Sequence, residues 1–308
     1  MITLSDSIHY FDLEYQGVPS VIACGLIEVA AGVVIVDPGP GITLSTLMRS
    51  LASRGLCAQD IKGILLTHIH FDHAGVTGAL VRENPRIVVY VHERGVRHLV
   101  DPQKLGDSAK RLYGDALLSL WGDFCPTPRA NVRSLYGGEQ IQVEGRRLCV
   151  AYTPGHASHH LSYFDTTSGV AFVGDAAGVR IGTSTFVMPP TPPPDVDLAL
   201  WMKSIDQISK WDSSRLFLTH FGPSPTTPVL HLTQLRERLH QVATFAQEAE
   251  ATGGNMKEQM AAFCAAMRSE LRAHLPGGTS LTYERAACLD HCYLGLIRYL
   301  NKSRGLDR

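Results

Sequence analysis

The chain has 308 residues, 44% hydrophobic and 19% charged, which is typical of globular proteins and unlike disordered or fibrous ones. At about 100 to 200 residues per domain, it accommodates one large domain or one domain with an extension. The 28 basic and 29 acidic side chains leave a net charge of −1. Because nucleic-acid binding usually requires a broad positive field, the sequence predicts no nucleic-acid partner.

The location of the protein is predicted from what the sequence lacks. No apolar run approaches the roughly 18 residues that cross a membrane, so we expect no membrane partner. The first residues show no basic start, apolar core or cleavage site, which predicts a cytoplasmic protein without a secretory signal. Seven scattered cysteines favour reduced thiols. Cys288 and Cys292, with His291 between them, are interpreted as buried helix residues, because no second cysteine pair accompanies them.

Up to about Arg215, short β-branched runs alternate with helix-like stretches, which predicts a layered α/β protein. The expected strands are residues 33–36, 61–67, 87–91, 148–153, 161–165, 170–173 and 216–219. Several of them run directly into acidic or histidine-bearing turns. In α/β folds the loops at strand ends carry the chemistry, so we expect the functional site there.

Two segments between these strands have unusual patterns. Residues 104–121 have helical spacing before a proline-rich breaker, which is compatible with a lid or with a packing helix. Residues 188–194 contain five prolines, so they can form neither a helix nor a central strand. We predict a rigid connector there, followed by a helix that begins near Asp195.

After Pro228 the pattern becomes purely helical. Apolar residues with three-and-four spacing predict amphipathic helices around 232–249, 256–271 and 282–302. We predict a helical extension over residues 229–308 that caps the active-site edge and lines the pocket. Met256, Phe263 and Tyr293 are the side chains expected to contribute. Such Leu- and Met-rich extensions commonly form dimer contacts, so a homodimer is also expected.

The most informative motif follows the expected strand at 61–67. The pattern H-x-H-x-D-H places His68, His70, Asp72 and His73 within six residues. Loop backbone after a buried strand can turn several such side chains toward one point. The pattern therefore predicts a metal site.

Three more candidate ligands follow later strands: His156, Asp175 and His220. Alone, each is more typical of a structural residue. Together with the H-x-H-x-D-H motif they make five imidazoles and two carboxylates. That set can hold two divalent ions and leave each with an open position for water or substrate.

With this order of motifs, residues 18–222 resemble the metallo-β-lactamase superfamily, in particular its glyoxalase II-like and lactonase-like hydrolases. The resemblance rests on the H-x-H-x-D-H run, the strand-end Asp37, and the later histidines and aspartate in the order of the family. It implies an α/β fold, a four-layer αββα sandwich with two metals at one edge. With that fold, residues 1–228 would form the catalytic domain and 229–308 the C-terminal helical extension.

The resemblance also implies a role for each ligand. It gives His68, His70 and His156 to a first metal, Asp72, His73 and His220 to a second, and Asp175 to a bridge between them. Asp37 would orient the ligand loop. No substrate-binding residue is predicted. Zinc is the first choice of metal, with manganese and iron as alternatives, because histidine-rich sites without thiolate accept all three.

These residues imply a metal-dependent hydrolase acting on a small molecule. A water that bridges two cations loses its proton near neutral pH, and the resulting hydroxide attacks a carbonyl. Asp72 lies beside this nucleophile in the scheme and is the candidate catalytic proton acceptor. Lactones, thioesters and other acyl esters are the expected substrates. A glutathione thioester is disfavoured, because residues 229–308 lack a matching basic set.

Several alternatives share the same fold. A mononuclear iron sulfur dioxygenase stays open, because unused ligand positions can still carry histidines. A phosphodiesterase or RNA nuclease shares the ligands, although the sequence has no basic substrate arm. An exported zinc β-lactamase is disfavoured by the absent signal and the absence of a cysteine ligand. His70 contradicts a flavodiiron enzyme, whose motif is H-x-E-x-D-H, and the complete ligand set argues against a non-enzymatic module.

Four other polar rings attract attention without a motif behind them. Tyr113 and Tyr163 could donate to an oxyanion or a leaving group, but a core or surface role is favoured for both. His159 and His160 follow His156 closely, and a structural role is favoured for them too.

Overall fold

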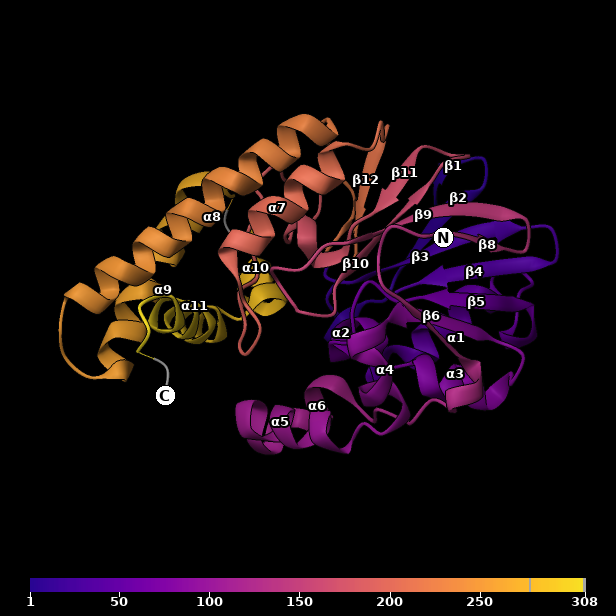
Figure 1. Cartoon of the computed structure of the whole chain (residues 1–308), viewed down its shortest axis with the longest axis horizontal. Helices are drawn as coiled ribbons and strands as arrows, with labels where there is room; N and C mark the ends of the chain where they lie inside the picture. Colours follow the sequence, from indigo (N-terminus) through magenta and orange to yellow (C-terminus); the bar gives the residue numbers. More distant parts are fainter. Residues whose placement is uncertain (277, 307–308) are drawn as a thin grey trace.

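The computed structural model describes residues 1–276 and 278–306, and two β-sheets packed face to face form its centre (Figure 1). The first sheet has seven strands in chain order: β1 (Ile2–Ser5), β2 (Ile8–Asp12), β3 (Ala23–Val29), β4 (Gly32–Val36), β5 (Ile61–Leu65), β6 (Val88–His92) and β7 (Val132–Leu135). The second runs in reverse order from β13 to β8: β13 (Gly222–Pro223), β12 (Arg215–Leu218), β11 (Val170–Phe172), β10 (Leu161–Asp165), β9 (Arg146–Tyr152) and β8 (Gln140–Val143).

Helices cover the outer faces of both sheets. On the first sheet lie α1 (Leu44–Ala52), α3 (Thr77–Glu83) and α4 (Glu93–Val100), and on the second lie α7 (Leu198–Ser209) and the start of α8 (Pro228–Ala251). The alternation within a strand explains the layers. In β12, Phe217 packs between the sheets, whereas Leu216 and Leu218 face α7 and α8. The predicted four-layer αββα sandwich is confirmed.

The expected strands are present, with small differences at their ends. The strand at 161–165 has the expected bounds. The strand expected at 61–67 ends at Leu65, because Thr67 leaves the sheet ladder and its amide donates instead to Asp37 Oδ1 at 2.8 Å. This early end begins the loop that carries the H-x-H-x-D-H residues, and α2 (Phe71–Ala74) closes it.

The segment expected to be one helix at 104–121 is two. Helix α5 (Gln103–Tyr113) ends at Gly114, a short 3₁₀ turn follows, and α6 (Leu117–Trp121) continues at an angle. Gly114 has φ +56°, which breaks a regular helix. The pair lies apart from the sheets, below α11 in Figure 1.

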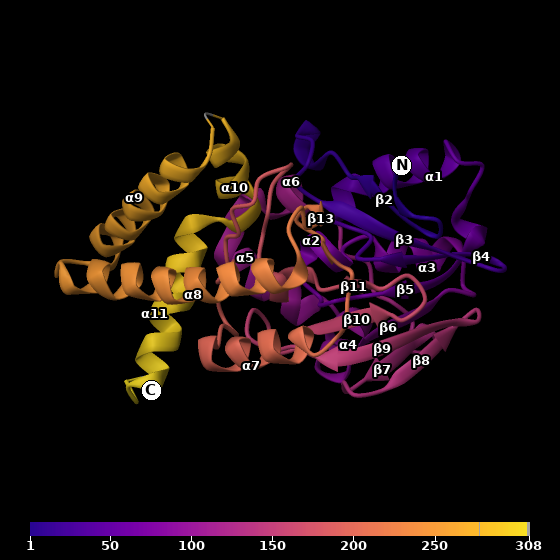
Figure 2. The ribbon, with the colours of Figure 1, turned by 90° about the horizontal axis from the view of Figure 1, so that it is seen from above.

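The C-terminal helices pack on one another beside the sandwich (Figure 2). They are α8, α9 (Met256–His274), α10 (Thr279–Ala287) and α11 (Leu289–Ser303). The helix expected at 282–302 is therefore two helices, because Cys288 has φ +48° and interrupts the backbone between them. Within the described residues, no helix is long and apolar enough to cross a membrane.

The side chains expected to reach from these helices into the pocket do not do so. Phe263 and Tyr293 are fully buried in the core that the C-terminal helices share, and Met256 is half-exposed at the start of α9. None of the three lines the cavity described below. Helical periodicity identified the buried face of each helix, but it could not tell which core that face enters.

Candidate metal centre

The seven predicted ligands come from four loops at one edge of the sandwich. The loop after β5 carries four of them, and the loops after β9, β11 and β12 carry His156, Asp175 and His220. Three groups could each hold an ion, with ligand atoms within 4.8 Å of one another: His68, His70 and His156; His68, His73 and Asp175; and Asp72, His73 and His220. Residues more than 150 positions apart in the chain thus converge on one site.

Three imidazoles form the first group. His70 Nδ1 lies 2.9 Å from His68 Nε2 and 3.0 Å from His156 Nε2. The opposite nitrogen of His156 donates to the carbonyl of Pro190 at 2.8 Å. That bond places the proton on Nδ1, so the lone pair of Nε2 faces the other two rings.

The second group combines imidazoles with carboxylates. His220 Nε2 lies 3.1 Å from Asp72 Oδ2, and His73 Nε2 lies 3.3 Å from Asp175 Oδ1. His220 Nδ1 donates to the carbonyl of Val21 at 2.9 Å, which again leaves Nε2 to face the site. The other oxygen of Asp175, Oδ2, lies 3.4 Å from His156 Nε2. The Asp175 carboxylate therefore lies between His73 and His156.

Two buried atoms show that these residues fit metal ions. His73 Nε2 and Asp175 Oδ1 have no hydrogen-bond partner within the described residues, although they face each other at 3.3 Å. A buried polar atom without a partner costs about 1–3 kcal/mol, and a cation bound by both atoms removes that cost. In tetrahedral zinc sites with bonds of about 2.0–2.1 Å, ligand atoms lie about 3.3 Å apart. The observed spacing agrees with that value.

Asp37 accepts four hydrogen bonds beside the loop that carries the candidate ligands, which its sequence position alone did not show. Its carboxylate accepts from the Thr67 amide at 2.8 Å and the Thr67 hydroxyl at 2.7 Å, from His73 Nδ1 at 2.8 Å and from the Thr219 hydroxyl at 2.6 Å. Asp37 is fully buried and adopts φ +48°. One carboxylate therefore fixes the ring of His73 and the two strand ends that precede the ligands.

The electrostatics divide the ligands into two kinds. Burial lowers the pKa of His68 well below its usual value and that of His70 to about 4, with neighbouring imidazoles adding to both shifts. In the second group, burial alone would lower the pKa of His73. The nearby carboxylates outweigh burial and raise that pKa above its usual value. His73 and His220 hold the pKa of Asp72 near 2. Neutral imidazoles and ionised carboxylates are the forms that bind metals, so His68, His70 and Asp72 are already in that form, whereas a metal must displace a proton from His73.

The other polar rings have distinct places. His160 Nε2 accepts from the Ala176 amide at 3.2 Å and its Nδ1 contacts the Thr153 hydroxyl at 2.9 Å, so it supports the turn of Asp175. Tyr163 is fully buried and donates to the Leu66 carbonyl at 2.8 Å, a core role. Tyr113, by contrast, lines the cavity beside the metal centre, where its sequence gave no motif.

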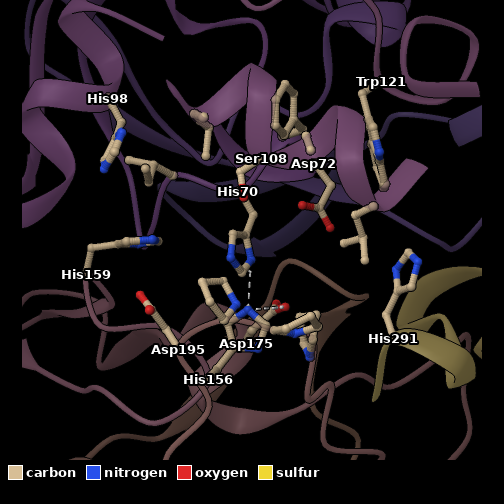
Figure 3. Close-up of a pocket in the computed structure, with 18 of the residues that line it drawn as sticks. His70, Asp72, His98, Ser108, Trp121, His156, His159, Asp175, Asp195 and His291 are labelled. Carbon is tan, nitrogen blue, oxygen red and sulfur yellow. Dashed lines mark hydrogen bonds and ion pairs between the residues drawn. The ribbon is translucent and has the colours of Figure 1, made fainter. Parts of the chain in front are cut away.

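A cavity of about 1320 Å³ opens over the ligands (Figure 3). The ligands at its floor are His70, Asp72, His156 and Asp175. Its walls come from α4, α5, α6, the segment 190–195 and the junction of α10 with α11. The C-terminal helices thus reach the cavity through residues 284–288 and His291, and the cavity is large enough for a drug-sized ligand.

The sheets, the four convergent loops and the cavity define an αββα sandwich protein with a cluster of candidate metal ligands at the sheet edge. A model of the metallo-beta-lactamase superfamily matches residues 17–220, about two-thirds of the chain. The chain therefore belongs to the metallo-beta-lactamase superfamily, whose members are generally metal-dependent hydrolases.

Individual relatives agree with this membership. The chain is 30% identical over 176 residues to the metallo-beta-lactamase fold-containing protein ST1585 of Sulfurisphaera tokodaii, covering 56% of this chain and 65% of that protein. It is 29% identical over 152 residues to a hydroxyacylglutathione hydrolase of Legionella pneumophila, covering 48% and 44%. The alignments thus span less than two-thirds of each of these curated relatives.

Solved structures extend the likeness in fold. The structure of ST1585 superposes with a TM-score of 0.66 at 22% identity and covers 95% of this chain and 99% of that chain. TTHA1623, solved in a di-iron-bound form, superposes with a TM-score of 0.51 at 26% identity, covering 68% and 91%. The first match shows that the fold likeness includes the C-terminal helices.

Proposed function

We propose that the protein is a dinuclear metal-dependent hydrolase of an ester-like bond in a lactone, a thioester or another acyl ester. The observation that carries the proposal is the convergence of seven candidate ligand side chains on one site, where Asp175 lies against both His73 and His156 and four of the seven line a large cavity. The di-iron form of TTHA1623 and the hydroxyacylglutathione hydrolase among the relatives support it.

The proposed ligands keep the roles given to them in the sequence. His68, His70 and His156 would hold one ion, Asp72, His73 and His220 the other, and Asp175 both. Bound divalent ions, with zinc as first choice and manganese or iron as alternatives, supply a water of lowered pKa and polarise a carbonyl.

The residues of the chain position this chemistry and move its proton. Asp72 lines the cavity; its Oδ2 faces His220 Nε2 at 3.1 Å, while its Oδ1 has no hydrogen bond to any described residue. Asp72 Oδ1 is therefore the atom we assign to accept the proton from the attacking water. The contacts from Pro190, Val21 and Asp37 fix the histidine rings, so the site does not reorganise during the reaction.

The experiment measures metal content together with turnover on a panel of lactones, thioesters, phosphodiesters and a cephalosporin. We expect about two ions per chain and hydrolysis of a lactone or an acyl ester, both reduced in His68→Ala and Asp175→Ala. Thr3→Ala, at the far edge of the first sheet, serves as the control. One iron per chain with oxygen uptake on a persulfide, and no hydrolysis, would overturn the proposal in favour of the sulfur dioxygenase.

The proposal extends to the localisation, the oligomeric state and the domain division of the protein. We infer a cytoplasmic enzyme with a small-molecule substrate, and a homodimer formed through the C-terminal helices. Residues 1–228 are proposed as the catalytic unit and 229–308 as the extension that caps it. The contribution of Cys288 and His291 to the cavity wall supports the capping role.

A further inference from the structure

The cavity has two chemically different arms, one on each side of the metal ligands. Figure 3 shows Trp121 and His291 on one side, beyond Asp72. It shows His98, His159 and Asp195 on the opposite side. We call the first side the aromatic arm and define it by four cavity-lining rings: Tyr15, Tyr113, Trp121 and His291.

The four rings contact one another in a chain. Tyr15 stacks on Trp121 with ring centroids 5.4 Å apart and an interplanar angle of 17°. Tyr113 meets the Trp121 ring edge-on at 5.5 Å and the His291 ring edge-on at 5.0 Å. Each ring comes from a different segment: the turn Tyr15–Gly17, α5, α6 and α11. These contacts hold the four cavity-lining rings in fixed positions relative to one another.

The aromatic arm also has a polar atom without a partner. The side chains of Trp121 and Tyr113 lie close enough to hydrogen-bond each other, whereas His291 Nδ1 is buried and has no hydrogen-bond partner within the described residues. Burial, with the charge of Asp72 adding to it, raises the pKa values of the Tyr15 and Tyr113 hydroxyls, so both stay protonated. Because His291 also lines the cavity, a polar group of a bound ligand can supply the partner that His291 Nδ1 lacks within the described residues.

A second stacked pair elsewhere in the molecule shows the contrast. Trp211 stacks on Phe164 with centroids 5.5 Å apart and an interplanar angle of 19°, nearly the geometry of Trp121 on Tyr15. Both tryptophans are partly buried, but Trp211 packs against the outer face of the second sheet and does not line the cavity. Stacking on the protein is thus common to both pairs, but Trp121, unlike Trp211, also lines the cavity that contains the candidate metal ligands.

We propose that the aromatic arm binds a flat aromatic ring of the substrate, and that a polar substituent on this ring bonds His291 Nδ1. The inference rests on the proposed hydrolase for the reaction, and it narrows the substrates to aromatic esters and thioesters. Ring binding itself requires only the four side chains. Aromatic surfaces favour a flat ring over a puckered one of similar size, because only the flat ring stacks or meets them edge-on.

The first test compares phenyl and cyclohexyl versions of the same ester. Phenylacetyl and cyclohexylacetyl thioesters of one thiol place the ring on the acyl side, and benzyl and cyclohexylmethyl acetates place it on the alcohol side. We expect kcat/KM to favour the phenyl member of at least one pair by about tenfold. Trp121→Leu should remove this preference, and Trp211→Leu should keep it. Equal rates within both pairs, or a preference unchanged in folded Trp121→Leu, would overturn the proposal.

The second test measures binding without turnover. Phenylacetate should change the tryptophan fluorescence of the protein and cyclohexylacetate should not, and the change should disappear in Trp121→Leu but remain in Trp211→Leu. Selective phenylacetate binding without hydrolysis of any ester supports the aromatic arm and rejects the hydrolase. Ester hydrolysis without ring preference or fluorescence change rejects the arm and keeps the hydrolase.

Discussion

Two parts of the site differ in how their side chains are held. We call the seven candidate ligands and their hydrogen-bond partners the edge, and the aromatic arm of the cavity the rim. At the edge, three ligand rings have their second nitrogen fixed, to Pro190, to Val21 and to Asp37. At the rim, Trp121 and His291 are partly buried, and His291 Nδ1 has no partner among the residues that the structure describes. The candidate metal ligands are therefore oriented by hydrogen bonds within the sandwich, whereas the rings of the aromatic arm lie on a turn and helices outside the sheets and contact one another.

The largest expected effect is a loss of metal affinity when Asp37, which holds His73 by a hydrogen bond, is replaced. Asp37→Asn replaces an oxygen that accepts hydrogen bonds with an NH₂ group, so at least one buried donor of Thr67, His73 or Thr219 loses its acceptor. Because residues that orient metal ligands typically contribute 10–100-fold, we expect metal affinity to fall by about that factor. Competition with a chelator of known affinity measures it.

The matched control is a buried aspartate away from the metal. Asp165 is fully buried and accepts from Arg146 Nε at 3.1 Å and from the Arg146 Nη2 at 2.6 Å. Asp165→Asn should lower the free energy of unfolding and leave metal affinity unchanged. Equal losses of metal affinity in both variants would show that Asp37 acts through general stability, not through His73.

The sequence predicted the edge far better than the rim, for a physical reason. Residues 68–73 lie in one loop and the remaining ligands directly follow strands, so local pattern places each of them. The hydroxyl of Thr219 and the carbonyl of Pro190 escaped notice, because a hydrogen bond to a partner 34 to 182 positions away leaves no local pattern.

The residues of the rim were the hardest to predict from the sequence. The helix break at Cys288, which brings His291 to Tyr113, depends on a left-handed residue that no glycine signals. The prediction that Met256, Phe263 and Tyr293 line the pocket is wrong. Apolar spacing identifies the buried face of a helix, but it does not show which core that face packs into. The aromatic arm combines four segments, and no single one of them carries a recognisable motif.

The connection between edge and C-terminal helices can be tested with pH. His231 in the first turn of α8 donates from Nε2 to the Ala177 carbonyl at 2.8 Å, in the turn that carries Asp175, and burial lowers its pKa to about 4. The unfolded chain, with a pKa near 6.5, binds the proton more readily, so stability falls as pH drops below about 6.5. At pH 5 this costs about 2 kcal/mol.

The measurement is urea unfolding of wild type and His231→Gln at pH 7 and pH 5. We expect the variant to be less stable at pH 7, because it loses the fixed ring, and the difference to shrink by about 2 kcal/mol at pH 5. His240→Gln, on the exposed face of the same helix, should show the pH dependence of wild type. A difference between wild type and His231→Gln that stays constant with pH would contradict the assignment.

A smaller effect is expected where α11 meets the segment 188–194. A Cβ on Gly295 would lie 2.0 Å from the Thr191 carbonyl oxygen, so Gly295→Ala must push the helix away. Overpacking of this kind costs about 1–3 kcal/mol. Because α11 carries His291, we expect the phenyl preference in kcat/KM to weaken while the metal content stays unchanged. Thermal unfolding measures the loss of stability, and the phenyl and cyclohexyl ester pairs measure the loss of preference. A loss of metal content would contradict this expectation and show that the segment 188–194 supports the metal ligands.

The smallest expected effect distinguishes a packing helix from a lid. Gly106 lies inside α5, and a Cβ there would meet nothing within 4 Å, so Gly106→Ala should stabilise the fold by about 0.5–1 kcal/mol. The rings of Tyr113 and Trp121 hold α5 and α6 to the other walls of the cavity, which favours a helix that stays in place. We therefore expect kcat to be unchanged. A kcat that falls as stability rises would mean that α5 must unwind in each turnover, and the rim would then be a moving part and not a fixed wall.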